Sequence, residues 1–249
     1  MWVAMASGAV TEPQRRLRMA AIGDLHVGRD QAATWRDLFV EVSREADVLV
    51  VTGDLTDLGR PEEARILAEE LRSCTVPVVA VLGNHDHESG QVAEVCEIVR
   101  GAGVHLLEGQ SCEIQGVGFA GVKGFAGGFG NRMLGSFGEP IIKQFVAETV
   151  NEALRLENAL RRVPNGRAVV VLHYAPVADT VAGEPVEILP FLGSSRLAET
   201  IDRFKVSAVV HGHAHRGRYE GRTPGGQPVF NVAAPIPKPT GRPYALIEV

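Results

Sequence analysis

The sequence predicts an α/β fold, and two patterns lead to this prediction. Short apolar, β-branched runs alternate with amphipathic stretches in the first part of the chain, which is typical of strand–helix–strand units. Polar residues follow these runs at a regular interval: 30 residues separate Asp24 from Asp54, and another 30 separate Asp54 from Asn84. This interval is about the length of one strand–helix–strand unit. Since right-handed crossovers keep the strands parallel, the three polar tips should lie side by side at one sheet edge.

Length and composition fit one large globular domain. The chain has 249 residues, of which 45% are hydrophobic and 22% charged, and this is enough to bury a core without disulfides. We expect an N-terminal extension over residues 1–18 and a single domain over residues 19–249. The basic cluster near residue 16 follows the weakly apolar start, which is the wrong order for a secretory signal. No stretch has the length of a membrane span, so the sequence favours a cytoplasmic protein without membrane partners.

Charge and cysteine content narrow the classes of partner. The net charge of −5 argues against broad, non-specific nucleic-acid binding, but it does not exclude a local basic patch. The three cysteines have no zinc-type spacing. Such a sparse, odd set favours free buried thiols in a reducing compartment, at Cys74, Cys96 and Cys112.

The first hundred residues are interpreted as three strands, each followed by a helix. Strands are expected over three mainly apolar runs, at 19–22, 47–51 and 76–82. Helices are expected where apolar residues recur at spacings of three and four, at 31–46, from Pro61 onward and at 91–101. Pro61 suits the first turn of its helix, and the acidic residues after it suit the positive end of the helix dipole.

The rest of the chain is richer in β structure. A strand at 104–107 and a hairpin over 112–123 precede the Gly-rich segment 124–138, which lacks the GxxxxGK[ST] pattern. A mobile surface loop near the site is therefore favoured over a phosphate-cradling loop. Pro140 starts a long helix whose predicted buried face consists of Ile142, Phe145, Val146, Val150, Leu154 and Leu160. The remaining expected elements are strands at 168–172, 207–210, 229–232 and 244–249, an irregular loop at 177–193 and a short helix at 194–204.

Five predicted strands end in side chains that can bind a metal ion. These side chains are Asp24 and His26, Asp54, Asn84 with His85, His173, and His213 with His215. Each histidine alone would more often be a core or surface residue, and the stretch 83–86 alone fits a polar turn. Together they favour a metal site, because clustered carboxylates and imidazoles are costly without a cation. Oxygen and nitrogen donors without cysteine suit Mn, Fe or Zn, and seven ligands suit two ions with Asp54 as the bridge.

These tips carry, in order over residues 24–215, the blocks D-x-H, G-D, G-N-H-D, H and G-H-x-H. In this the sequence resembles the calcineurin-like binuclear metallophosphoesterase superfamily, a resemblance that implies a four-layer α/β/β/α sandwich. It implies one metal held by Asp24, His26, Asp54 and His215, and a second held by Asp54, Asn84, His173 and His213. It also implies that His85 faces the substrate phosphate or leaving group and that Asp86 orients its ring. His87 and His211 lie outside these blocks and are expected behind the ligands or on the surface.

The resemblance implies a phosphoester hydrolase that uses a hydroxide activated by two divalent metal ions, with Mn favoured over Fe and Zn. A phosphodiester substrate is favoured, because the compact chain lacks a large capping domain and the site should be fairly open. Phosphomonoesterases, protein phosphatases and nucleases of the superfamily stay open as alternatives. A catalytically silent interaction scaffold is a remote one, since every ligand position is filled. Further basic groups that could contact the substrate, or only carry surface charge, are Arg132, Arg216, Arg218 and Arg222.

Overall fold

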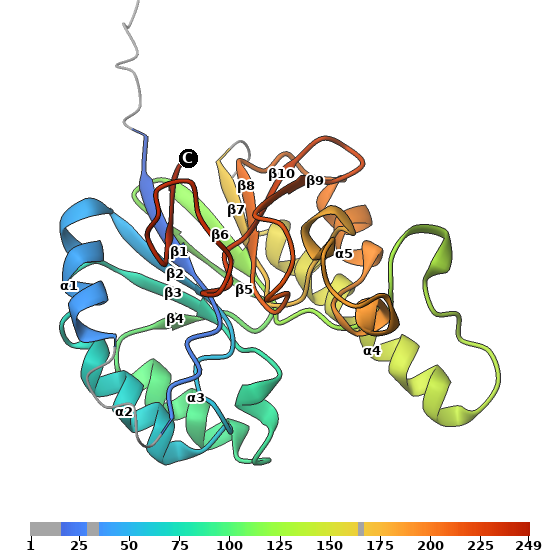
Figure 1. Cartoon of the computed structure of the whole chain (residues 1–249), viewed down its shortest axis with the longest axis horizontal. Helices are drawn as coiled ribbons and strands as arrows, with labels where there is room; N and C mark the ends of the chain where they lie inside the picture. Colours follow the sequence, from blue (N-terminus) through green and yellow to red (C-terminus); the bar gives the residue numbers. More distant parts are fainter. Residues whose placement is uncertain (1–15, 29–34, 164–166) are drawn as a thin grey trace, which may run out of the picture.

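Two mixed β-sheets pack face to face in the centre of the molecule, and helices cover the outer face of each sheet (Figure 1). This computed structural model describes residues 16–28, 35–163 and 167–249. The predicted α/β/β/α sandwich is therefore confirmed as the arrangement of the described residues.

The first sheet has the strand order β11-β1-β2-β3-β4. Its strands are β1 (Arg18–Ile22), β2 (Val48–Thr52), β3 (Val78–Val81), β4 (His105–Leu106) and β11 (Ala245–Glu248). All neighbours pair in parallel except β11, which is antiparallel to β1. The connecting helices are α1 (Arg36–Glu45), α2 (Pro61–Leu71) and α3 (Val92–Gly101). The ends of β1, β2 and β3 therefore lie side by side at one sheet edge, as the regular spacing predicts.

The second sheet has the order β5-β6-β7-β8-β10-β9. Its strands are β5 (Gln110–Ile114), β6 (Val117–Gly121), β7 (Ala168–Val171), β8 (Ala208–His211), β9 (Glu220–Arg222) and β10 (Pro228–Asn231). The two edge strands, β5 and β9, pair antiparallel to their neighbours, whereas the central strands are parallel. Helices α4 (Pro140–Leu160) and α5 (Ser195–Ile201) cover its outer face.

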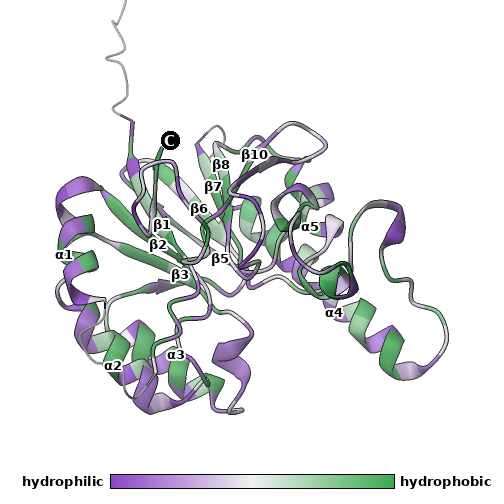
Figure 2. Cartoon of the chain, in the orientation of Figure 1, coloured by the Kyte–Doolittle hydropathy of each residue, from purple (hydrophilic) through white to green (hydrophobic). Residues whose placement is uncertain are grey.

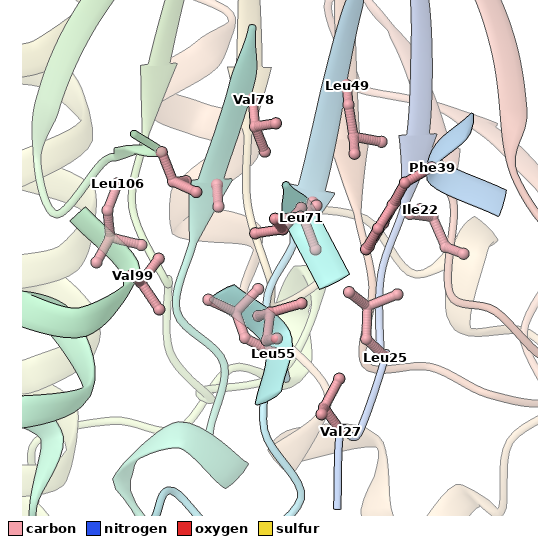
Figure 3. Packing of buried hydrophobic residues seen from close by; sticks show 14 of the residues in the cluster. Ile22, Leu25, Val27, Phe39, Leu49, Leu55, Leu71, Val78, Val99 and Leu106 are labelled. Carbon is pink, nitrogen blue, oxygen red and sulfur yellow. The ribbon is translucent and has the colours of Figure 1, made fainter. Parts of the chain in front are cut away.

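The alternation of side chains along the strands produces these layers. In β1, Ala20 packs on the helix side while Met19 and Ala21 pack between the sheets, because successive side chains point to opposite faces. Figure 3 shows the helix-side cluster, in which Leu49 of β2 and Val78 of β3 lie with residues from the helices. Both faces of these strands are buried, which explains why their sequences are continuously apolar (green in Figure 2).

Several predicted boundaries change in the structure. Leu17 is buried and exchanges backbone hydrogen bonds with Val249, so the strand pairing starts before residue 19, while residues 1–15 lie outside the described residues. The first four residues of the helix predicted at 31–46 also lie outside them. Within the predicted loop 177–193 the chain forms two 3₁₀ helices, η3 (Asp179–Val181) and η4 (Val186–Phe191). The edge strand β9 was not predicted, because its short Glu-Gly-Arg sequence has no apolar pattern.

The Gly-rich segment was predicted to be a mobile surface loop, and its first half is instead packed. Gly124, Ala126, Gly127 and Gly128 are buried, and the hydroxyl of Thr149 in α4 donates to the carbonyl of Ala126 at 2.6 Å. The second half, which includes the 3₁₀ helix η2 (Gly130–Arg132), is exposed. Glycines in the first half thus allow close packing against α4 and α5.

The described residues contain no helix that is long and apolar enough to cross a membrane. The three cysteines are free, as predicted, but only Cys96 is buried, whereas Cys74 and Cys112 are half-buried. Burial raises the pKa of both Cys96 and Cys112 to about 11, so these thiols are poor nucleophiles at neutral pH.

Candidate metal centre

The polar tips of five strands meet in one cluster that spans both sheets. Three groups have donor atoms that all lie within 4.8 Å of one another: Asp24, His26 and His215; His26, Asp54 and His85; and Asp54, His173 and His213. Asp54 and His26 each belong to two groups, which makes the cluster continuous. Asn84 joins it, because its side-chain oxygen lies 2.9 Å from Nε2 of His173. The structure therefore brings together all seven predicted ligands, and the role of each as a ligand stays a prediction.

Backbone strain is concentrated at the same residues. Asp24, His26, Asp54 and His213 have φ values of 61°, 45°, 46° and 69°, in the left-handed region. Among the described non-glycine residues only Gln115 shares this conformation. Each such residue costs about 1–3 kcal/mol, and the strain persists only where the surroundings fix it. The fold thus maintains strained backbone at the points where the cluster side chains converge.

Two glycines make room for the cluster. A Cβ atom on Gly83 would lie 2.0 Å from Oδ1 of Asp54. A Cβ atom on Gly53, whose φ is 88°, would lie 2.6 Å from Nδ1 of His173. Neither clash is tolerable, so glycine is required before both Asp54 and Asn84 for steric reasons.

Asp24 anchors one side of the cluster. Its carboxylate accepts hydrogen bonds from the backbone N–H of His213 at 3.0 Å and from Nε2 of His215 at 2.8 Å. Burial alone would raise the pKa of Asp24. The hydrogen bond from His215 and the charges of the nearby imidazoles together lower this pKa by more, so the net shift is downward. The same hydrogen bond raises the pKa of His215, whereas burial lowers the pKa of His26.

His173 and His213 are oriented on the other side by main-chain carbonyls. Nδ1 of His173 lies 2.8 Å from the carbonyl oxygen of Thr52, to which it can donate, and this leaves Nε2 facing Asp54 at 3.4 Å. Nε2 of His213 lies 3.2 Å from the carbonyl oxygen of Phe191. Burial lowers the pKa of His213 to about 3, so its ring is neutral at physiological pH, as a metal ligand must be.

The donor set fits divalent cations. Nδ1 of His26 is a buried nitrogen without a hydrogen-bond partner, in the part of the chain that the structure describes. The other ring nitrogen, Nε2, lies 3.8 Å from Oδ2 of Asp54 in the cluster of carboxylates and imidazoles, where a cation would offset the desolvated negative charge. Oxygen and nitrogen donors of this kind suit Mn, Fe and Zn alike, so they do not select one metal.

His85 reaches the cluster, but Asp86 does not orient its ring, and that expectation is corrected. Nδ1 of His85 lies 2.6 Å from the carbonyl oxygen of Asp57, and its ring meets that of His26 edge-on, with 4.4 Å between centroids. A main-chain carbonyl therefore holds the tautomer that leaves Nε2 free. Asp57 was not predicted, because a backbone contact leaves no side-chain signal in the sequence.

Asp86 has a structural position behind the cluster. It is fully buried and accepts four hydrogen bonds: from the backbone N–H groups of Gly83 (2.8 Å), Leu55 (3.2 Å) and Thr56 (2.9 Å), and from the Thr56 hydroxyl (2.6 Å). Burial raises the pKa of Asp86. The carboxylate thereby ties the loop after β2 to the loop after β3.

The remaining polar residues that the sequence singled out lie around the cluster. His211 is fully buried, its Nε2 lies 2.8 Å from the Thr180 hydroxyl, and burial lowers its pKa to about 4. His87 is exposed, which agrees with a surface position. All four candidate arginines are exposed, and the guanidinium of Arg222 donates to the carbonyl of Gly226 in its own turn.

Asn231 is a further residue of the site that the sequence did not identify. It is fully buried at the end of β10, and its amide nitrogen donates to the carbonyls of Ala214 (2.7 Å) and Thr180 (3.3 Å). Ala214 separates His213 from His215, so this amide fixes the loop that carries both imidazoles. The available signal was a polar residue at the end of an apolar strand.

Replacing Asn231 by Ala should therefore weaken metal binding without removing a ligand. We expect about 10-fold lower Mn²⁺ affinity, since groups that support ligands contribute at this level. We also expect about 2–3 kcal/mol less unfolding free energy, because buried carbonyls lose their donor. Calorimetric titration and urea unfolding measure the two effects. Asn151→Ala, on the exposed face of α4, is the matched control, and equal Mn²⁺ affinity in both variants would contradict the supporting role.

Comparison with known proteins gives a family match over most of the chain. Residues 17–217 match the family described as calcineurin-like phosphoesterase. The chain is 27% identical over 171 residues to a probable glycerophosphodiester phosphodiesterase of Arcobacter nitrofigilis, covering 68% of this chain and 57% of that protein. It is 28% identical over 178 residues to a 3',5'-cyclic-nucleotide phosphodiesterase of Nostoc sp., covering 71% and 58%. The matched part thus spans less than two thirds of either relative.

Solved structures share the fold at low sequence identity. The phosphopantetheinyl hydrolase from Mycobacterium tuberculosis superposes with a TM-score of 0.63 at 17% identity, covering 94% of this chain and 97% of that one. A second structure, TT1561 of Thermus thermophilus, gives a TM-score of 0.54 at 15% identity, covering 88% and 90%. Identities this low establish a common architecture and carry no information on substrate.

Proposed function

Because the chain belongs to the calcineurin-like phosphoesterase family, we propose that it is a phosphodiesterase that works with two divalent metal ions. The observation that carries the proposal is the continuous cluster in which Asp54 is shared between donor groups. Both curated relatives are named as phosphodiesterases, which supports a diester substrate over a monoester.

The ligands divide between two ions in a way that the geometry allows. Asp24, His26 and His215, together with Asp54, would hold one ion, and Asp54, His173 and His213, together with Asn84, would hold the other. When bound, such ions supply a nucleophile near neutral pH by lowering the pKa of coordinated water, and they offset the charge of a phosphate. Mn²⁺ is our first choice, with Fe and Zn as alternatives that the same donors accept.

We assign His85 the role of proton donor to the substrate, and two contacts support this assignment. Its Nδ1–H is held by the carbonyl of Asp57, so Nε2 is the atom available to a bound phosphodiester. The ring packs against His26, which keeps it beside the donor groups. Protonated at Nε2, His85 would donate a hydrogen bond to a phosphoryl oxygen or a proton to the departing alkoxide. After the proton transfer its imidazole ring would be neutral.

The experiment that tests this proposal compares two substrates on one protein. The protein is stripped of metal, reloaded with Mn²⁺ and assayed with bis-p-nitrophenyl phosphate and p-nitrophenyl phosphate. We expect Mn²⁺-dependent cleavage with a higher kcat/KM for the diester. Asn84→Ala should lose activity, because it removes a ligand, while Asn151→Ala on the surface of α4 should keep it.

The other outcomes identify the alternatives. Preference for the monoester would indicate a phosphomonoesterase or protein phosphatase. Cleavage of short DNA or RNA together with an electrophoretic shift would indicate a nuclease. No turnover of any of these substrates by protein that carries two ions would contradict the proposed hydrolase and indicate an interaction scaffold.

A further inference from the structure

Two neighbouring segments expose large apolar side chains that the rest of the described chain leaves uncovered. The first turns of α4 expose Ile141 (67%) and Ile142 (42%), and the 3₁₀ helix η4 exposes Val186 (69%) and Phe191 (56%). In Figure 1 the start of α4 projects from the body of the molecule, and Figure 2 shows apolar residues (green) along it. Apolar side chains gathered in this way are unusual on a protein surface without a binding role.

Ring contacts join the two segments. Phe145 of α4 lies edge-on to Phe191 of η4, with 6.3 Å between centroids. Phe145 also contacts Phe125 at 4.9 Å, and Phe125 contacts Tyr174 at 6.0 Å. We refer to the surface formed by Ile141, Ile142, Phe145, Val186, Ile188 and Phe191 as the apolar wall.

The apolar wall is continuous with the metal centre. The carbonyl oxygen of Phe191 lies 3.2 Å from Nε2 of His213, a predicted ligand. The ring of Tyr174, which starts the aromatic series, lies 4.4 Å from the ring of His213. A phosphate bound at the cluster would therefore place one of its ester substituents beside these rings.

Backbone contacts hold η4 in this position. The N–H of Gly127 donates to the carbonyl of Pro190 at 2.8 Å, and Leu189 packs on a small buried cluster that includes Leu192. The exposed side chains of η4 are thus presented by an anchored segment, and ligand binding there does not have to order it first.

We propose that the apolar wall binds the alkyl chain of an amphiphilic phosphodiester whose phosphate lies at the metal centre. The inference rests on the proposed function and narrows it to substrates in which one ester group is an extended hydrocarbon. The main-chain contact of Phe191 with His213 places η4 beside the predicted ligands. This position favours an alkyl ester as the occupant, because one such molecule would contact both the ligands and η4.

The test measures how kcat/KM depends on chain length. Ethyl, butyl and hexyl p-nitrophenyl phosphates are used below their critical micelle concentrations. In each, the oxygen of water bonds to phosphorus, p-nitrophenolate leaves, and an alkyl phosphate remains. If the chain is partly buried on the wall, kcat/KM should rise about two-fold per methylene, or about 16-fold over the four methylenes from ethyl to hexyl.

Variants locate the effect on the protein. The double variant Ile141→Ser with Val186→Ser should reduce the hexyl-to-ethyl ratio towards one. Leu154→Ser, which changes an exposed leucine of α4 (52%) outside the apolar wall, is the matched control and should keep the ratio of the wild type. Calorimetric titration of the Mn²⁺-loaded protein with ethyl and hexyl phosphate gives a readout without turnover, and we expect the same preference for hexyl.

The outcomes separate this inference from the proposed function. Cleavage of the ethyl ester with no dependence on chain length would overturn the inference and leave the phosphodiesterase intact. No cleavage of any diester would end the proposed function, while the titration with alkyl phosphates would still decide the inference. Two further results, each without a chain-length effect, would overturn the inference. Flotation of the protein with phosphatidylcholine vesicles would assign the wall to a membrane, and a dimer that dissociates in the double variant would assign it to a second copy of the chain.

Discussion

Asp54→Asn is expected to lose both metal ions together and to reduce kcat for bis-p-nitrophenyl phosphate at least about 10³-fold, a loss of roughly 4 kcal/mol of transition-state stabilisation. The reason is geometric, because Asp54 is the carboxylate that belongs to the donor groups on both sides of the cluster. The amide is nearly isosteric but neutral, so one change removes the charge that both ions would share in the proposed centre. The backbone N–H of His85 keeps an acceptor at 2.9 Å only if the amide oxygen takes the place of Oδ1.

Metal content and thermal stability measure this prediction independently of turnover. Ions that bind only the folded protein raise its unfolding free energy by about 2.7 kcal/mol at 100 times their Kd. The wild type should therefore melt at higher temperature with Mn²⁺, and Asp54→Asn should show little shift. Asp37→Asn, on the exposed surface of α1, is the matched control. Retention of two Mn²⁺ ions by Asp54→Asn would show that this carboxylate does not bridge them.

The residues themselves were sufficient for the buried strands and for the convergence of the site, whereas the four layers were implied by the resemblance to a known family. Strands such as β2 and β3 are apolar on both faces, and this composition predicts cover on both sides. The equal intervals that separate Asp24, Asp54 and Asn84 predict parallel neighbours whose ends meet. Both arguments work because strand alternation and crossover handedness are general properties of polypeptide chains.

Some predictions of buried residues were wrong, because a single sequence does not show which segment packs against a given side chain. Helical periodicity correctly gave an apolar face for α4, and Val146 and Leu160 are buried. It also assigned Ile142 and Leu154 to that face, and both are exposed because no described segment covers them. Periodicity reports which side of a helix is apolar and leaves open what packs there. Ile142, which was predicted to be buried, is one of the exposed residues of the apolar wall.

The Gly-rich segment shows the same limit in another form. Glycine is typical of mobile loops, and it is also required wherever two backbones approach closely. At Gly127 the second reason applies, since a Cβ atom there would lie 2.8 Å from a methyl carbon of Thr149. Composition alone does not distinguish the two, because the neighbour that forbids a side chain comes from α4.

Asp86→Ala should produce a large loss of stability, about 3–5 kcal/mol of unfolding free energy. The substitution leaves three buried backbone N–H groups and one hydroxyl without their acceptor. Removing one partner from a buried charged network costs this much, because the remaining groups are desolvated and unpaired. Total stabilities of about 5–15 kcal/mol make the change visible in urea unfolding. Thr56→Val, which removes only the hydroxyl donor, is the graded control and should cost about 1 kcal/mol.

The same experiment decides between two roles for Asp86. If the carboxylate oriented the ring of His85, Asp86→Ala would keep its stability and its metal ions and lose only turnover. If it ties the loops after β2 and β3 together, stability and Mn²⁺ affinity should fall together, because Gly83 precedes Asn84 and Leu55 follows Asp54. The contact of His85 with the Asp57 carbonyl favours the second role, since the ring is held without Asp86. An Asp86→Ala protein with unchanged unfolding free energy and Mn²⁺ affinity would restore the orienting role.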